Sequence, residues 1–143
     1  MAKKDWRHRA REAALQVLYQ WEVGKMDVPR AADTFFTLQW ADATPPPDDL
    51  RQFAETLAND TVTRLEACDA LIAETAKNWR PERIAVVDRL VLRIAICEML
   101  RDAAAPPAVV IDEALELART FSSEDAVKFI NGMLDAIRKK LER

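Results

Sequence analysis

The chain has 143 residues, half of them apolar, which suffices for one domain with an ordinary core, and its many helix formers favour an all-α fold. No apolar run approaches the roughly 20 residues of a membrane span, and the N-terminus lacks a signal-peptide pattern, which predicts a soluble, cytoplasmic protein. The net charge of −3 is uneven: residues 1–11 carry +4 and residues 138–143 carry +3, which leaves −10 for the residues between them.

The first predicted helix, over residues 3–24, changes character along its length. Its first third is basic, with five Lys/Arg and His8, and its remainder repeats apolar residues at three- and four-residue spacing. We expect the basic third to hold its cations in solvent and the remainder to bury one face. Gly24 would end this helix in the left-handed conformation, which glycine adopts without steric cost.

A second helix is predicted to begin near Pro29, because proline fits a first helical turn. Its buried side would comprise Ala32, Phe35 and Phe36, and the same spacing is compatible with Trp40 as a further residue of that side. Three consecutive prolines end residues 43–47, and they cannot continue a helix.

Two more helical segments follow the proline run. Residues 48–78 are long for one globular helix, so we expect a break between Leu65 and Asp69, with Asp69 capping the next helix. Residues 83–100 are apolar nearly all round, which is typical of a central helix covered by several neighbours.

The last two predicted helices are separated by a pair of serines. Ser122 and Ser123 are expected to stop the first of these helices and can cap the final one. Ser122, followed three residues later by Asp125, resembles a capping box. Gly132 interrupts that helix and predicts a close approach by another helix, since glycine costs about 1 kcal/mol there relative to alanine.

The residues that carry chemistry do not form a catalytic pattern. His8 is the only histidine, and neither a Gly-rich phosphate loop, a nucleophile elbow nor a metal-binding cluster is present. We therefore expect no enzymatic activity, no catalytic residues, no metal and no cofactor. Cys68 and Cys97 lack metal-site spacing and are predicted to be reduced core thiols.

The basic segment predicts contact with a polyanion or, equally, a solubilising tail. Lys4, His8 and Arg11 share one side of the helix, and Lys3, Arg7 and Arg11 share another, so several phosphates are within reach. Guanidinium groups also stack on bases, which suits RNA. Trp6 and Tyr19 could stack on bases too, although the core is the commoner place for such residues.

Three motifs carry a family resemblance in this order: RHRAREAALQVLYQWEVG, VVDRLVLRIAICEM and VVIDEALELARTFSSEDAVKFINGMLDAIRKKL. Together they resemble the NusB family of bacterial transcription antitermination factors over nearly the whole chain. The resemblance implies one all-helical RNA-binding domain over residues 1–143, with about six or seven helices in two small bundles. It also implies binding of the boxA element of ribosomal RNA leaders together with the ribosomal protein NusE. Such a complex joins elongating RNA polymerase, suppresses premature termination and assists ribosomal RNA maturation.

The resemblance also assigns site residues by position. The arginine-rich RNA-binding segment is Lys3, Lys4, Arg7, His8, Arg9 and Arg11, and Tyr19 lies at a family position near RNA. A second RNA-proximal patch comprises Phe121, Asp125, Lys128 and Phe129, while Asp88 and Glu98 match acidic positions implied to face NusE. The chain departs from the family at Ser122, where a glycine is frequent, so the turn geometry there is open.

Two other interpretations stay open. A helical interaction module, acting as a dimer or adaptor without a nucleic-acid role, would explain the core and leave the basic segment as a tail. A NusB-like domain also occurs ahead of RNA cytosine methyltransferases, although no methyltransferase sequence follows Arg143. A homodimer formed through the RNA-binding or NusE-binding surfaces is also compatible with the resemblance.

Overall fold

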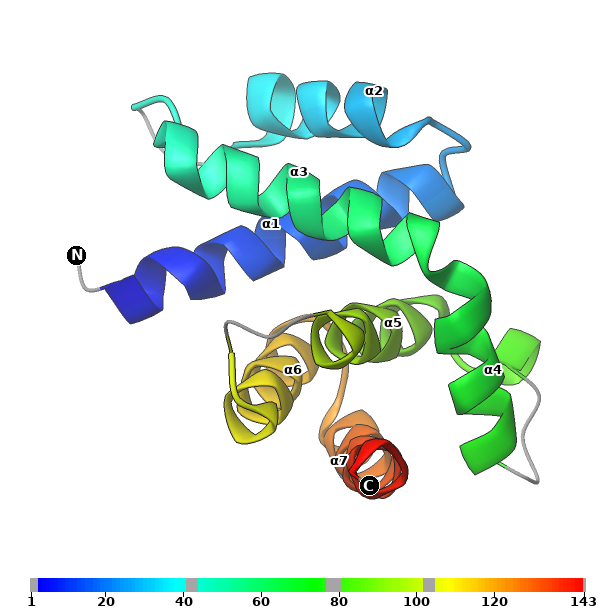
Figure 1. Cartoon of the computed structure of the whole chain (residues 1–143). Helices are drawn as coiled ribbons and strands as arrows, with labels where there is room; N and C mark the ends of the chain where they lie inside the picture. Colours follow the sequence, from blue (N-terminus) through cyan, green and yellow to red (C-terminus); the bar gives the residue numbers. More distant parts are fainter. Residues whose placement is uncertain (1–2, 41–43, 77–80, 102–104, 143) are drawn as a thin grey trace. The chain divides into compact units, whose positions relative to one another are not determined.

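The computed structural model describes residues 3–40, 44–76, 81–101 and 105–142, with the backbone alone for residues 3–5 and 81. These ranges contain helices and no strand, which confirms the predicted all-α class (Figure 1). The elements are α1 (Lys3–Glu22), α2 (Val28–Thr34), the π-helix η1 (Phe35–Gln39), α3 (Asp48–Thr63), α4 (Leu65–Thr75), the 3-10 helix η2 (Pro81–Arg83), α5 (Val86–Leu100), α6 (Pro107–Phe121) and α7 (Glu124–Leu141).

The chain divides into two compact units, Met1–Asp60 and Thr61–Arg143. This division agrees with the two small helical bundles that the family resemblance implies. The assignment of the whole chain to a single domain stays a prediction. None of the helices in the described ranges is long and apolar enough to cross a bilayer.

The first unit buries the apolar face of α1 against α2 and η1. That face consists of small and medium side chains, and Ala10, Val17 and Leu18 are fully buried. As predicted, Pro29 lies in the first turn of α2, and the Asp27 side chain caps this helix by accepting a 2.9 Å hydrogen bond from the Arg30 amide. The predicted buried residues of the second helix, Ala32, Phe35 and Phe36, are all buried.

The helix α1 ends near Gly24 as predicted, but Gly24 is not the residue in the left-handed conformation. The left-handed residue is Lys25, with φ of 58°, and Gly24 does not have a positive φ. A Cβ atom at Gly24 would instead lie 2.7 Å from the backbone oxygen of Gln20. Glycine is therefore required here by a close approach of the chain to itself, which spacing in the sequence does not reveal.

The third segment breaks as predicted, but at Arg64, one residue before the predicted range, and the prediction that Asp69 caps the next helix is wrong. α3 ends at Thr63 and α4 begins at Leu65. Asp69 lies inside α4, where its two carboxylate oxygens accept hydrogen bonds of 2.8 and 2.9 Å from Arg93. A buried guanidinium needs an anionic partner, so the carboxylate serves tertiary packing rather than a helix end.

In the second unit, α5 is the central helix, as its apolar sequence predicted. It packs against α4, α6 and α7 (Figure 1). Every residue from Leu90 to Glu98 is buried, which is how a helix covered on all sides behaves. Cys68 and Cys97 are buried free thiols, in agreement with the expectation of reduced core cysteines.

The N-cap of α7 and the surroundings of Gly132 differ from the predictions. The serine pair ends α6 and caps α7 as predicted, but the cap is Ser123, whose hydroxyl accepts a 3.1 Å hydrogen bond from the Ala126 amide, so Ser122 does not form the capping box. Gly132 is exposed, and no atom lies within 4 Å of the position that its Cβ would occupy. The predicted close approach of another helix is therefore absent from the part of the chain that the structure describes.

Candidate nucleic-acid interface

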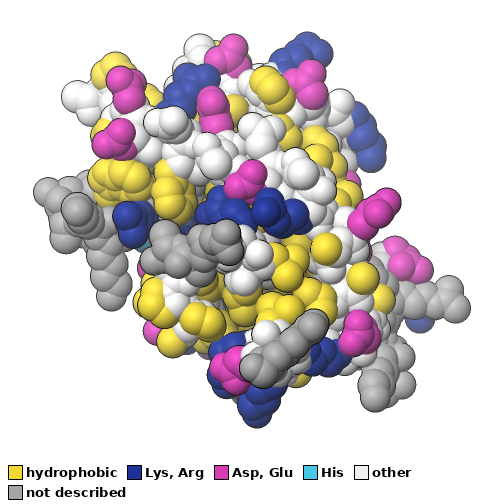
Figure 2. Space-filling model, viewed as in Figure 1, with side chains coloured by type: hydrophobic (Ala, Val, Ile, Leu, Met, Phe, Trp, Pro, Cys, Tyr) yellow, Lys and Arg dark blue, Asp and Glu magenta, His cyan; other side chains and the backbone are white. Residues whose placement is uncertain are grey.

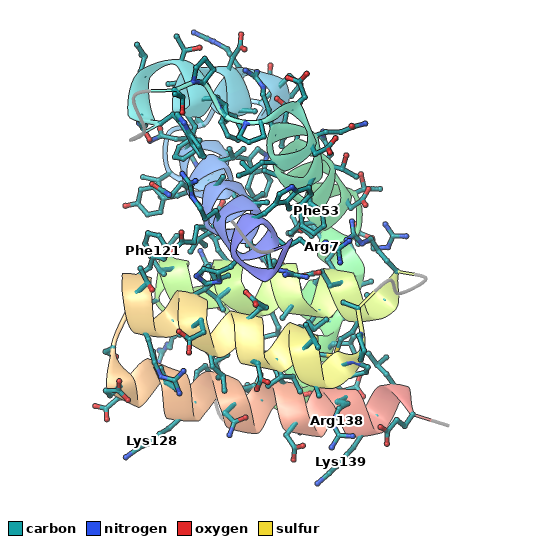
Figure 3. The ribbon with its side chains drawn as sticks, turned by 90° about the vertical axis from the view of Figure 1, so that its left-hand side faces the viewer. Arg7, Phe53, Phe121, Lys128, Arg138 and Lys139 are labelled. Atoms are coloured by element: carbon teal, nitrogen blue, oxygen red, sulfur yellow. The ribbon has the colours of Figure 1, made fainter. Side chains whose placement is uncertain are left out.

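Among the cations of the basic segment whose side chains are described, Arg7 is the exposed one (Figure 3). Its guanidinium carbon lies 5.9 Å from the centroid of the Trp6 ring, and among the residues with described side chains it forms no ion pair. The side chains of Lys3 and Lys4 lie outside the described residues. An exposed arginine on a helix, with no ion pair among the described side chains, can pair with an external phosphate at little desolvation cost.

His8 and Arg9 lie farther into the helix and are half-buried. The His8 Nε2 atom lies 3.5 Å from a carboxylate oxygen of Glu12, one helical turn away. The guanidinium carbon of Arg9 lies 4.6 Å from the centroid of the Trp40 ring, which is a close cation–π contact. Both side chains are therefore partly accessible to solvent, and contacts with Glu12 and Trp40 hold them in place.

Arg11 contradicts the expectation that the whole basic segment points into solvent. Only 4% of this residue is exposed. It lies three residues before Ala14 and seven before Leu18, so it shares the apolar face of α1. Its guanidinium carbon lies 5.5 Å from the centroid of the Phe53 ring, as an amphipathic side chain with an apolar stem allows. Its predicted role in RNA binding is untested.

Tyr19 lies on the solvent side of α1, with 41% of the residue exposed. The core was the commoner expectation for it, and the structure leaves its ring accessible instead. Trp6 is half-buried and packs edge-to-face on Phe53, with the ring centroids 5.7 Å apart. Of the two aromatic residues considered for stacking, Tyr19 is thus the more available.

The predicted second patch gathers where α6 gives way to α7. Phe121 and Phe129 are half-buried, whereas Asp125 and Lys128 are exposed. Figure 3 labels Phe121 and Lys128. Asp125 and Phe129 line a cavity of about 270 Å³ that also takes in Asp88 at the start of α5. The structure therefore brings two predicted RNA-proximal residues together with one predicted partner-binding residue.

The turn that carries this patch is fixed by Ser122. Its hydroxyl donates a 2.6 Å hydrogen bond to the carboxylate of Asp88. The geometry of this turn was open in the sequence because Ser122 replaces a frequent glycine, and the hydrogen bond to Asp88 holds the serine in its place. Glu98, the other residue assigned to NusE, is buried with 6% exposed, and its predicted contact is untested.

The basic C-terminal end of the chain differs from the basic segment of α1. Arg138 pairs with Asp135 at 2.9 Å and with Glu142 at 2.7 Å, and Lys139 lies 3.2 Å from Asp135. The hydrogen bond from Arg138 is the main reason why the pKa of Asp135 is lowered. Lys140 lies 3.6 Å from a carboxylate oxygen of Glu74 in α4, so the described cations at this end already have acidic partners. Figure 2 shows basic and acidic side chains interspersed over the face that it draws.

The sequence pattern of the NusB family matches residues 8–139 of this chain. The chain belongs to the NusB family. One relative, the transcription antitermination protein NusB of Solibacter usitatus, is 43% identical over 135 residues, which are 94% of this chain and 90% of that protein. The protein of the same name from Exiguobacterium sp. is 41% identical over 134 residues, covering 94% of this chain and 98% of that protein.

Solved NusB structures share the fold. T. maritima NusB superposes with a TM-score of 0.82 at 31% identity, covering 94% of this chain and 91% of that chain. A crystal structure of the antitermination factors NusB and NusE in complex with dsRNA superposes with a TM-score of 0.80 at 26% identity, covering 95% of this chain and 98% of that chain. Membership of the NusB family was predicted from the three motifs and is confirmed.

Sequence reasoning within the NusB resemblance missed one part of the surface. Trp40 was considered only as a residue of the second helix's buried side, and Gln39 was not considered. Both line a cavity that also takes in Arg9 and Glu12. The signal in the sequence was weak, because a tryptophan shortly before a proline run looks like an ordinary end of a helix.

Proposed function

We propose that this chain is a transcription antitermination factor that binds single-stranded RNA of ribosomal leaders at boxA. It would do so together with NusE, as part of an elongating RNA polymerase complex, and assist ribosomal RNA synthesis and maturation. Two things support this beyond family membership: relatives named transcription antitermination protein, and a related NusB that forms a complex with NusE and dsRNA. The proposed role is that of a cytoplasmic binding factor without enzymatic activity.

The observation that carries the proposal is the state of Arg7. The chain has two basic ends, but at the C-terminal end Arg138 and Lys139 already pair with acids. Arg7 is exposed and forms no ion pair among the described side chains. A phosphate can therefore bind Arg7 without displacing any acid among the described side chains, whereas binding at Arg138 has to break existing pairs.

The remaining site residues follow from this proposal. RNA contacts are assigned to Lys3, Lys4, His8, Arg9, Arg11 and Tyr19 on α1 and to Phe121, Asp125, Lys128 and Phe129 around the turn before α7. Asp88 and Glu98 are assigned to NusE. Because the described cationic surface is small, we expect weak RNA binding by the chain alone and tighter binding when NusE adds contacts.

The test is a salt-dependent titration of boxA RNA and a scrambled RNA of equal length, with and without NusE. We expect NusE to tighten binding of boxA more than of the scrambled RNA. Arg7→Ala should weaken binding and reduce the slope of log affinity against log salt by about 0.7, the value for one phosphate contact on a single strand. Lys139→Ala is the matched control, since its charge is paired with Asp135.

Two results would contradict the proposal. The first is equal affinity for both RNAs under every condition. The second is an Arg7→Ala variant that binds like the parent while NusE binding is intact. Either result would favour a helical interaction module with a basic tail.

A further inference from the structure

A small cavity lies in the first unit, between α1 and the end of η1. Its volume is about 160 Å³, well below the roughly 300–1,000 Å³ of pockets for drug-sized ligands. Its lining includes Arg9, Glu12, Gln16, Phe35, Gln39 and Trp40. A cavity of this size suits a single ring system rather than a whole nucleotide.

The π-helix explains why the cavity exists. In η1 the hydrogen bonds span one residue more than in an α-helix, which widens the last turn before Trp40, and such turns are frequent at functional sites. The backbone becomes extended at Trp40, with φ of −66° and ψ of 120°. The indole nitrogen of Trp40 donates a 3.0 Å hydrogen bond to the Thr44 carbonyl oxygen, which fixes the ring.

Part of the lining is built from flat groups, one guanidinium and two aromatic rings. The guanidinium carbon of Arg9 lies 4.6 Å from the Trp40 ring centroid. Phe35 meets the same indole nearly edge-on, with ring centroids 6.4 Å apart and an interplanar angle of 81°. Planar ligands stack on such surfaces, and base–aromatic stacking is a main source of affinity for single-stranded nucleic acids.

The polar part of the lining can read the edge of a base. The Glu12 carboxylate accepts hydrogen bonds, and the amides of Gln16 and Gln39 can both donate and accept. Nucleobase edges present donors and acceptors side by side, so this combination is complementary to them. A phosphate fits less well, because the Glu12 carboxylate repels an anion placed beside it.

We propose that this cavity receives one unstacked base of the bound RNA. This inference rests on the proposed function and deepens it, because it assigns a base-reading subsite to η1 and the adjoining part of α1. The sugar and phosphate of that nucleotide would stay outside, on the side of α1 that carries Arg7. Arg9 would then contribute its flat face to stacking as well as its charge.

The test combines protein variants with RNAs in which one base at a time is replaced by an abasic site. Gln39→Ala should weaken binding of the intact RNA about 3- to 10-fold by removing a hydrogen-bonding amide. Trp40→Ala should weaken it about 5- to 100-fold, the range for loss of one stacking partner. For one abasic position both losses should vanish, because the base that the cavity holds is already missing.

The control variant is Leu38→Ala, since Leu38 is 78% exposed on the same π-helix and is not among the residues that line the cavity. It should bind every RNA like the parent. Circular dichroism checks that each variant is folded, and Gln39→Ala keeps the test decisive if Trp40→Ala fails to fold. The indole N–H signal of Trp40 in NMR spectra should shift on addition of the intact RNA and stay in place with the RNA abasic at that position.

Failure of this inference differs from failure of the proposed function. If the parent binds boxA RNA and Arg7→Ala weakens it, but Gln39→Ala and Trp40→Ala behave like Leu38→Ala, the base subsite is wrong and the RNA-binding role stands. The same holds if the Trp40 signal shifts with NusE alone and not with RNA. If the parent does not discriminate boxA from scrambled RNA, the proposed function fails and the subsite with it.

Discussion

The hydroxyl of Ser122 donates a 2.6 Å hydrogen bond to the carboxylate of Asp88. The bond connects the turn after α6 to the first turn of α5, two places that are 34 residues apart in the sequence. Asp88 also lines the cavity of about 270 Å³ in the second unit. The same carboxylate is therefore part of the fold and part of the surface assigned to NusE.

These two roles of Asp88 can be separated by two substitutions. Ser122→Ala removes the donor and should lower the free energy of unfolding by about 0.5–1.5 kcal/mol, with little change in affinity for NusE. Asp88→Asn keeps an oxygen that accepts the bond but removes the charge, so it should retain stability and weaken NusE binding. Urea unfolding and a NusE binding titration measure the two effects. Equal loss of NusE affinity in both variants would show that orientation, and not charge, matters at this site.

The ion pair between Asp69 and Arg93 predicts a large loss of stability when one partner is removed. The Arg93 side chain is only 8% exposed, and Asp69 accepts two of its hydrogen bonds. Asp69→Ala should lower the free energy of unfolding by about 1.5–3 kcal/mol, because it removes charge-assisted bonds to a buried guanidinium. The double variant with Arg93→Met should recover part of the loss, since it no longer buries a guanidinium that has lost two charge-assisted hydrogen bonds. An additive double variant in urea unfolding would contradict this account.

The thiol of Cys68 predicts a loss of stability at alkaline pH. Burial raises the pKa of Cys68 from about 9 to about 12. The unfolded chain therefore loses this proton at a lower pH than the folded chain, and stability falls as pH rises from about 9 towards 12. At pH 10 the loss from this group is about 1.4 kcal/mol relative to neutral pH. Cys68→Ala should lose less stability than the parent between about pH 8 and pH 10 in urea unfolding, because the thiol of the unfolded chain loses its proton there while the folded one keeps it. Parallel curves would refute the assignment.

Substitution of the two glycines by alanine should change the free energy of unfolding in opposite directions. At Gly24 a Cβ atom would lie 2.7 Å from the Gln20 backbone oxygen, so Gly24→Ala should cost about 1–3 kcal/mol through forced movement of the chain. At Gly132 nothing lies within 4 Å of the Cβ position, so Gly132→Ala should stabilise α7 by about 0.5–1 kcal/mol. Thermal unfolding of both variants measures the two signs. A destabilised Gly132→Ala variant would indicate that a part of the chain outside the described residues contacts that face.

The features that could be predicted from the sequence are those set by periodicity. The apolar sequence of residues 83–100 identified α5 as the central helix, and the described structure buries every residue from Leu90 to Glu98. The proline at position 29 and the proline run before Asp48 marked the starts of α2 and α3. Each of these signals is local, because it depends on residues within a few turns of one another.

The features that could not be predicted depend on contacts between distant residues. Aspartate is a residue type that often caps helices, but the partner of Asp69 is Arg93, which lies 24 residues away on another helix. Arg11 belongs to a basic run, yet Phe53 on α3 covers it. The base-sized cavity requires both α1 and a π-helix, and no local pattern distinguishes η1 from the end of an ordinary α-helix.

The burial of both cysteines has a practical consequence for experiments on this chain. A maleimide dye reacts with an accessible thiolate, and Cys68 and Cys97 offer none while the protein is folded. A Gly132→Cys variant would place one reactive thiol on an open stretch of helix. Fluorescent or spin labels could thus be attached at a single defined position without first removing the native cysteines, and assembly with RNA and NusE could be followed through that label.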